Sequence, residues 1–124
     1  MFKVLKDSKY KYEITEFVTH KLHFTIDKPL FSHKYFTIDG FILCVKPGYQ
    51  WDGASGPAIN TSDFIVPSLV HDCLYQCIRE GIIDKKYKKD ADKELYILCR
   101  EYSMNWFRAQ YVYLAVKLFG NFHI

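Results

Sequence analysis

The sequence lacks the long apolar runs that membrane-spanning and exported proteins carry. No run approaches the ~20 apolar residues that a membrane-spanning helix needs. The first residues, Met-Phe-Lys-Val-Leu-Lys, contain no apolar core long enough for a signal peptide. These two absences predict a cytoplasmic protein without a membrane span.

Dense positive charge is almost absent as well. The net charge is only +3, from 17 Lys and Arg against 14 Asp and Glu. The one basic run, Lys-Lys-Tyr-Lys-Lys at 85–89, lies between two predicted helices, where charged residues usually form a solvated loop. Since proteins that bind duplex nucleic acid usually carry a basic stripe, the sequence does not favour a duplex as the partner.

The chain has four cysteines, and their spacing argues against two common frameworks. No C-x-x-C pair is present, which disfavours a structural zinc site. Cys73 and Cys77 lie one helical turn apart on the same face as leucines, which favours buried free thiols in a reducing compartment over disulfides. The other two cysteines are Cys44 and Cys99.

What is present is typical of a globular protein. Of the 124 residues, 49% are hydrophobic and 25% are charged, so the chain can bury a sizeable core and is not predicted to be disordered. It contains no internal repeat, low-complexity tract or linker. The length favours a single domain, residues 1–124.

The first half of the chain has the period of β-structure. Apolar and polar side chains alternate over 10–14 and again over 22–26, which predicts half-buried strands. Two further apolar runs, 35–38 and 41–45, flank an Asp-Gly pair at 39–40. This pair predicts a hairpin, because both central residues of the tight turn need a positive φ. The run 41–45 is apolar on both faces, which indicates a central strand.

The second half has helical period. Pro67 suits the first turn of a helix and Gly81 its end, and a second helix is predicted over about 90–102. Ser103 is the predicted cap of a third helix over 105–119, with Gly120 ending it. That helix is apolar almost all round, so it is either central or part of an interface. The predicted fold is α+β: a small antiparallel sheet followed by three helices.

The stretch His-Asp-Cys-Leu-Tyr at 71–75 carries the most chemistry. On a helical wheel His71 lies at the edge of the apolar stripe, with Tyr75 beside it one turn later. Asp72 points further out, toward a loop or an ion. A half-buried histidine can have its tautomer fixed and its pKa tuned by a partner, although a structural histidine is the commoner case.

Asp92 lies at the edge of the apolar stripe of the second helix. Two antiparallel helices joined by a short loop would bring that edge toward His71. Asp92 would then accept the imidazole N–H of His71, orient the ring and stabilise its protonated form. The alternative is a structural role, in which Asp92 caps its helix or pairs with Lys88 or Lys89.

The loop Asp-Gly-Ala-Ser-Gly-Pro at 52–57 is the third candidate part of the site. Its glycines would let backbone groups approach a ligand closely. Carbonyls and carboxylates, including those of Asp52 and Asp72, suit a divalent cation such as calcium or magnesium, whereas exposed amides suit an oxyanion. Ser55 would be a nucleophile if His71 reached it, but no G-x-S-x-G pattern surrounds it. Asp52 and Gly53 also suit a simple turn.

The order D-G-A-S-x-P, H-D-x-L-Y, A-D and a C-terminal aliphatic stretch resembles an uncharacterised family of phages and prophages, domain of unknown function number 1353. The resemblance covers about residues 45–120. It implies a phage-type origin and the cytoplasm of the host cell, and it brings no established activity. It is carried by the following residues: Asp52, Gly53, Ala54, Ser55, Pro57, His71, Asp72, Leu74, Tyr75, Ala91, Asp92, Leu118, Phe119 and Gly120.

The pattern H-D-x-x-Y on a helix is also similar to the active-site helix of secreted phospholipases A2. That resemblance implies His71 as the general base for a water, Asp72 as a calcium ligand and Asp92 as the carboxylate that orients the histidine. The chain differs in having no disulfide framework, and 52–55 is not the calcium loop of that family. The similarity is therefore one of geometry, not of descent or substrate.

Three functions fit these residues. In the first, the protein is a small hydrolase of ester or phosphodiester substrates, such as lipids, cell-wall material or a nucleotide signal of host immunity. His71 activates water or Ser55, Asp92 orients His71, and Asp52 with Asp72 binds a divalent cation or positions the substrate.

In the second, the same site binds a small anionic ligand, such as a host-defence nucleotide signal, without catalysis. Trp51 or Tyr75 would stack on the ligand, and the loop with Asp52 and Gly53 would donate amides. In the third, the protein is a virion-assembly component, and the apolar helix at 105–119 joins copies into a homo-oligomer.

Overall fold

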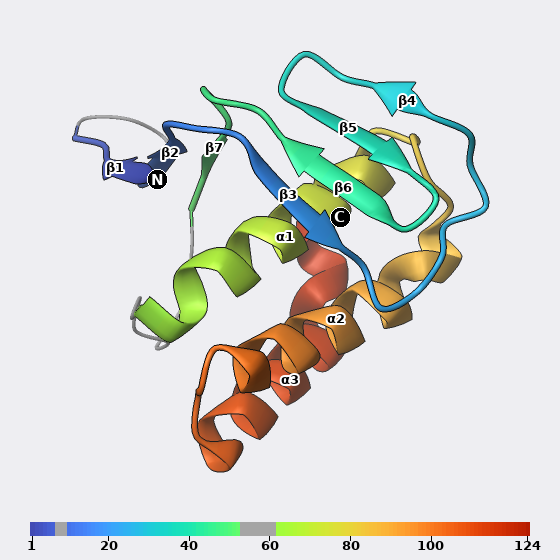
Figure 1. Ribbon diagram of the computed structural model, residues 1–124. Coiled ribbons are helices and arrows are strands. Elements are labelled where there is room, and N and C mark those ends of the chain that lie inside the picture. Colours follow the sequence, from blue (N-terminus) through green and yellow to red (C-terminus); the bar gives the residue numbers. More distant parts are fainter. Residues whose placement is uncertain (7–9, 53–61) are drawn as a thin grey trace. The chain divides into compact units, whose positions relative to one another are not determined.

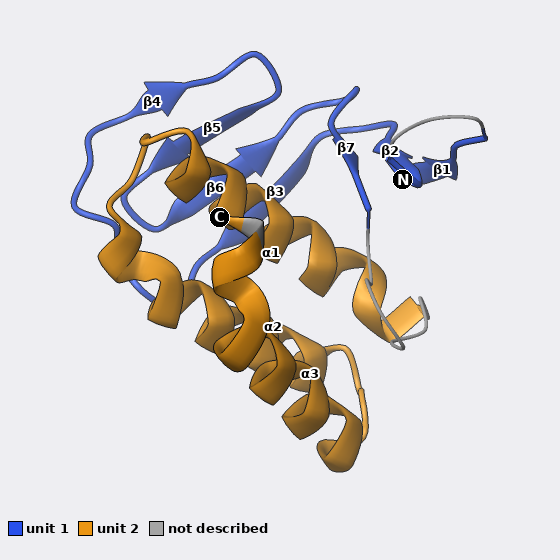
Figure 2. Ribbon diagram, turned by 180° about the vertical axis from the view of Figure 1, so that it is seen from behind, with its two compact units in different colours: residues 1–52 blue, residues 53–124 orange. Residues whose placement is uncertain are grey.

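The computed structural model describes residues 1–6, 10–52 and 62–124 (Figure 1). The chain divides into two compact units, Met1–Asp52 and Gly53–Ile124 (Figure 2). The first unit contains two small antiparallel sheets and the second contains three α-helices, so the predicted α+β class is confirmed, with two sheets instead of one. Among the described residues, no helix is both long and apolar enough to cross a bilayer.

The smaller sheet joins three short strands in the order β1-β2-β7: Phe2–Val4, Tyr12–Ile14 and Gln50–Trp51. As the alternation predicted, Tyr12 and Ile14 point into the core, and the residue between them is half-buried. Trp51 pairs with Tyr12 across the ladder, with ring centroids 5.4 Å apart, and Phe2 packs edge-on against Tyr12 at 5.6 Å. These aromatic contacts form the core of this sheet.

The larger sheet has the order β3-β6-β5-β4, from Val18–Lys21, Ile42–Val45, Phe36–Asp39 and Phe31–Ser32. The strand β6 is paired on both edges, which confirms the prediction of a central strand over the apolar run that it occupies.

The strand predicted over 22–26 is wrong, because the chain pairs earlier, at β3, and then bends. The backbone amides of Leu22 and Ile26 bond to the carbonyls of Phe41 and Gly40, at 2.7 and 3.0 Å. The segment therefore wraps the turn of the neighbouring hairpin and does not extend the ladder. Leu22 and Ile26 are nevertheless buried, which accounts for the apolar alternation that suggested a strand.

The predicted hairpin is present between β5 and β6, but its turn is displaced by one residue. Asp39 pairs with Ile42, so Gly40 and Phe41 are the two central residues. Gly40 has a φ of 60°, whereas Phe41 is not among the described residues with positive φ. This is the pattern of a type II′ turn, which needs glycine only at its first central position.

The helices of the second unit are α1 (Ser62–Arg79), α2 (Lys88–Glu101) and α3 (Trp106–Phe119). Short 3-10 turns at Lys85–Tyr87 (η1) and Gly120–His123 (η2) precede α2 and follow α3. The helix α2 packs against both α1 and α3. An apolar cluster joins the three helices and consists of Phe64, Leu95, Cys99, Met104, Ala109 and Val112.

The prediction that Pro67 opens the first helix is wrong, because α1 begins at Ser62 and contains Pro67. A proline inside a helix costs about 3 kcal/mol, since it has no amide hydrogen for the carbonyl one turn earlier. The added turn buries Phe64, Ile65 and Val66, each worth about 1.5–3 kcal/mol. Their burial outweighs the cost of the proline.

The start of α3 also differs from the prediction. Asn105, not Ser103, is the cap, and its side chain accepts the amide N–H of Arg108 at 2.8 Å. Ser103 instead takes a φ of 68°, the left-handed conformation that ends the preceding segment. Only Ala109 and Val112 of α3 are buried, so the helix is not central to the unit.

The cysteines are free, as the sequence predicted. Cys73, Cys77 and Cys99 are buried, and Cys44 is half-buried. Burial in the apolar cluster and the nearby Asp63 carboxylate raise the pKa of the Cys99 thiol to about 12, although Arg108 opposes this shift. This thiol is therefore protonated and part of the core.

Candidate functional site

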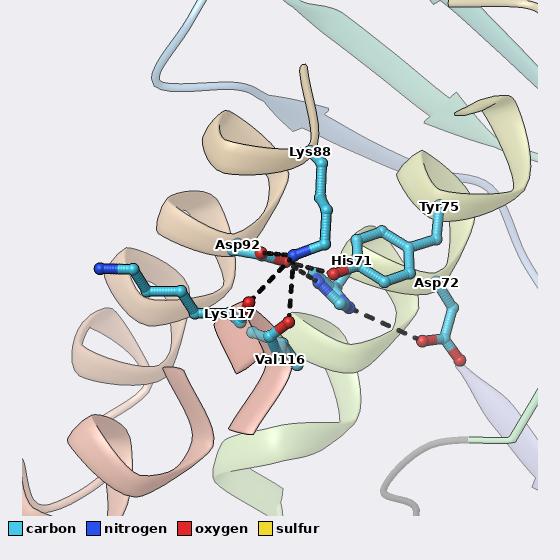
Figure 3. Close-up of polar contacts among 7 residues, drawn as sticks. All are labelled: His71, Asp72, Tyr75, Lys88, Asp92, Val116 and Lys117. Atoms are coloured by element: carbon cyan, nitrogen blue, oxygen red, sulfur yellow. Dashed lines mark hydrogen bonds and ion pairs between the residues drawn. The ribbon is translucent and has the colours of Figure 1, made fainter. Parts of the chain in front are cut away.

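Asp92 is the centre of a buried polar network in the helical unit (Figure 3). Its Oδ1 lies 2.9 Å from His71 Nε2 and accepts the Tyr75 hydroxyl at 2.5 Å. Its Oδ2 accepts the Lys88 ammonium at 2.7 Å. The hydrogen bond between His71 and Asp92 is the contact that the helical periods predicted, and the structure confirms it.

The elements bring these side chains together by simple spacing. His71 and Tyr75 are one turn apart on α1, with ring centroids 4.0 Å apart, so both face the same carboxylate. Lys88 and Asp92 are likewise one turn apart on α2. Because α1 and α2 pack together, the two pairs meet.

The network keeps Asp92 ionised. Burial alone would raise the pKa of its carboxyl group, but the hydrogen bonds from His71, Lys88 and Tyr75 outweigh burial and lower the pKa below the ordinary 3.8. Burial and the Asp92 carboxylate raise the pKa of Tyr75, so its hydroxyl stays protonated and donates. Asp92 is therefore an ionised hydrogen-bond acceptor, and the Tyr75 hydroxyl is a neutral donor to it.

The ionised state of Asp92 determines the tautomer of His71. An ionised carboxylate can only accept hydrogen bonds, so the imidazole Nε2 must carry a hydrogen toward Asp92. In the neutral ring the lone pair then lies on Nδ1. That nitrogen faces Asp72, at 4.0 Å from its Oδ1 (Figure 3). His71 itself is 6% exposed, more buried than its place on a helical wheel implied, because the network covers its other edge.

Asp72 differs from Asp92 in its surroundings. About a third of its side chain, 32%, is exposed, whereas Asp92 is almost fully buried. Asp92 has committed both oxygens to three donors and cannot readily serve a metal ion. Asp72 is therefore the carboxylate of this unit that could contribute to a cation site beside His71.

Lys88 has a larger role than the sequence suggested. The sequence predicts Lys88 only as a pairing partner of Asp92. Its ammonium also donates to the backbone carbonyl of Val116 at 3.1 Å and lies 3.5 Å from that of Lys117 (Figure 3). It thereby ties the last turn of α3 to the central carboxylate. The i,i+4 spacing of Lys88 and Asp92 could have revealed the ion pair, but not the carbonyl contacts.

The sequence predicts that Gly120 ends the third helix, and Gly120 does follow the last residue of α3. Its φ of −60° is helical, so it is not needed there for a left-handed turn. It is needed for space, since a Cβ at this position would lie 2.1 Å from the Tyr75 hydroxyl oxygen and 3.2 Å from Lys88 Cε. The absence of a side chain lets the end of α3 close over the network.

The loop at 52–57 is only partly described. Gly53 and Ser55 lie outside the described residues. Trp51 and Asp52 belong to the other compact unit, where Trp51 is buried against Tyr12 and Phe2 and Asp52 is exposed. The part of the site brought together within the helical unit therefore consists of His71, Asp72, Tyr75, Lys88 and Asp92.

The arrangement can accept and hold a proton at His71 Nδ1. As the ring becomes an imidazolium, the Asp92 carboxylate beside Nε2 stabilises the new charge. Tyr75 and Lys88 keep that carboxylate in place.

Compared with known proteins, the chain matches no family model, no curated protein and no solved structure. The two resemblances of the sequence therefore stay predictions.

Proposed function

We propose that the protein is a small phage-type hydrolase in which His71 is the general base for cleavage of an ester or phosphodiester bond. The observation that carries this proposal is the 2.9 Å hydrogen bond from His71 Nε2 to Asp92, since it leaves Nδ1 as the basic nitrogen. A carboxylate that orients the imidazole and stabilises its protonated form is the usual partner of a histidine general base.

The proposed reaction has two proton transfers. Nδ1 of His71 takes a proton from a water molecule as the water oxygen bonds to the carbonyl carbon or phosphorus of the substrate. The imidazolium then returns the proton to the leaving oxygen as the bond to it breaks. Asp92 stays ionised throughout and stabilises the imidazolium. A base positioned in this way contributes about 10²–10⁴-fold to the rate.

The experiment compares variants on a panel of ester and phosphodiester substrates. We expect His71→Asn to lose about 10²–10⁴-fold in kcat/KM, because the amide cannot accept the proton. His23→Ala, which changes an exposed histidine, is the matched control and should retain full activity. Unchanged turnover in a folded His71→Asn protein would remove the proposal, and an intact small ligand recovered after native purification would favour a binding function.

Two further variants refine the chemistry. If water is the nucleophile, the Ser55→Ala variant should keep most of the activity. If the variant loses its activity, Ser55 is the attacking group. If Asp72 helps to hold calcium or magnesium, a chelator should lower the rate of the native protein, and Asp72→Asn should be slower and insensitive to the chelator. A rate that a chelator leaves unchanged would exclude assistance by a cation.

A further inference from the structure

The helix α3 carries two apolar faces, and only one of them is covered. Ala109 and Val112 are buried against the core between α2 and α3, and Val116 is partly buried there. On the opposite face lie Phe107, Tyr111, Leu114 and Leu118, which we call the α3 seam. All four members of the seam are between 52% and 80% exposed.

The spacing of the α3 seam is that of a helix–helix contact. Its members follow one another at intervals of four, three and four residues. This alternation keeps one stripe along a helix facing a partner helix, as in a coiled coil. An apolar surface without such order would not specify the shape of its partner. The occupant that fits the seam is therefore a helix.

The α3 seam is also symmetric in sequence, which identifies the helix. The seam consists of an outer pair, Phe107 and Leu118, and an inner pair, Tyr111 and Leu114. Both pairs have the same midpoint in the sequence, between Val112 and Tyr113. If two copies of α3 pack antiparallel about a two-fold axis through that point, each aromatic ring of one copy meets a leucine of the other. A two-fold interface requires such a self-complementary surface.

The exposed area of the α3 seam reaches the size of a small interface. Its four side chains are 52–80% exposed. A large apolar side chain carries about 150–250 Å² of surface, so the four together expose on the order of 500 Å². Two copies would then bury about 1,000 Å² in total, which is the lower bound for a specific interface.

The charges of α3 do not oppose this contact. Its two cationic side chains lie off the seam: Arg108 pairs with Asp63 at 3.2 Å, and Lys117 lies 6.0 Å above the Tyr113 ring. No acidic residue occurs between Asn105 and Ile124. We propose that two copies of the chain dimerise through antiparallel packing of their α3 seams. This proposal is independent of the hydrolase chemistry.

Sedimentation of the full chain tests the proposal. We expect the native protein to be a dimer at micromolar concentrations and Leu114→Glu to raise the dissociation constant about 100-fold, because the two-fold axis buries the new charge twice. Leu30→Glu, at an exposed leucine outside α3, is the matched control and should stay dimeric. Circular dichroism checks that both variants fold. A monomeric native protein, or one that binds neutral lipid vesicles instead, would overturn the proposal.

Disulfide trapping tests the orientation, in a Cys44→Ser background. Positions 107 and 118 lie about 16 Å apart along one helix, too far for a disulfide within the chain. In an antiparallel dimer, Phe107→Cys and Leu118→Cys proteins should cross-link when mixed and only weakly alone. Efficient cross-linking of each variant with itself would indicate parallel helices, and no cross-linking in any combination would contradict the interface.

Discussion

At the scale of the residue, the balance of charge around Asp92 governs the site. A buried carboxylate is unfavourable unless its hydrogen bonds offset the loss of water. Here His71, Tyr75 and Lys88 supply them, and together they lower the pKa of Asp92 despite burial. The same contacts determine which nitrogen of His71 is basic. The chemistry of one residue therefore depends on the ionisation of another.

Asp92→Asn should make this dependence measurable as a loss of stability. The variant leaves Lys88 without a countercharge, and removing one partner of a buried pair costs about 3 kcal/mol. Because the folded pKa of Asp92 is depressed, its stabilising effect is present above the unfolded value of 3.8 and is lost as the pH falls below it. The gap in unfolding free energy between the native and variant proteins should therefore narrow as the pH falls below 3.8.

Urea unfolding at a series of pH values measures that gap. Asp90→Asn, at an exposed carboxylate of the same helix, is the matched control and should show almost no gap at any pH. A gap for Asp92→Asn that fails to narrow below pH 3.8 would contradict the depressed pKa of Asp92.

The helical periodicity of the sequence predicts part of this site. Helical periodicity predicted that His71 and Asp92 lie at the edges of two neighbouring stripes, and their hydrogen bond confirms it. The contribution of Lys88 to the carbonyls of Val116 and Lys117 could not be predicted in this way. Those carbonyls arrive from a third helix, and no spacing within α2 encodes where α3 ends.

At the scale of the element, the junction of α3 and η2 packs closely against the polar network around Asp92. Gly120 makes this fit possible because it has no side chain. Helix α1 shows a related point, since burial of its first turn outweighs the cost of Pro67 inside the helix. In both places the packing of an element overrides the usual local role of glycine or proline.

Gly120→Ala should therefore weaken both the fold and the site. The added methyl group would lie 2.1 Å from the Tyr75 hydroxyl oxygen, so Tyr75 or the end of α3 must shift. Overpacking of this kind costs about 1–3 kcal/mol, which a thermal melt would detect. Asn121→Ala, at the exposed next residue, should change stability by less than about 0.5 kcal/mol. Equal melting temperatures for the Gly120→Ala and native proteins would show that the junction is not tightly packed.

At the scale of the whole molecule, the proposed dimer has a thermodynamic consequence. Dimerisation stabilises the folded chain by mass action, so the melting temperature should rise with protein concentration. We expect an increase of about 5 °C between about 1 and 100 µM for the native protein. The melting temperature of Leu114→Glu should rise much less over the same range of concentration. Scanning calorimetry measures both, and a native melting temperature independent of concentration would argue against the dimer.

The sequence by itself determined the class of fold, the hairpin and the pairing of His71 with Asp92. Each of these depends on local periodicity and turn chemistry, which neighbouring residues encode. Only the tertiary structure decided that 22–26 wraps a turn, that α1 continues through Pro67, that Lys88 reaches the end of α3 and that the α3 seam is exposed. These outcomes depend on which distant surfaces meet, and burial there exceeds the local preferences of the chain.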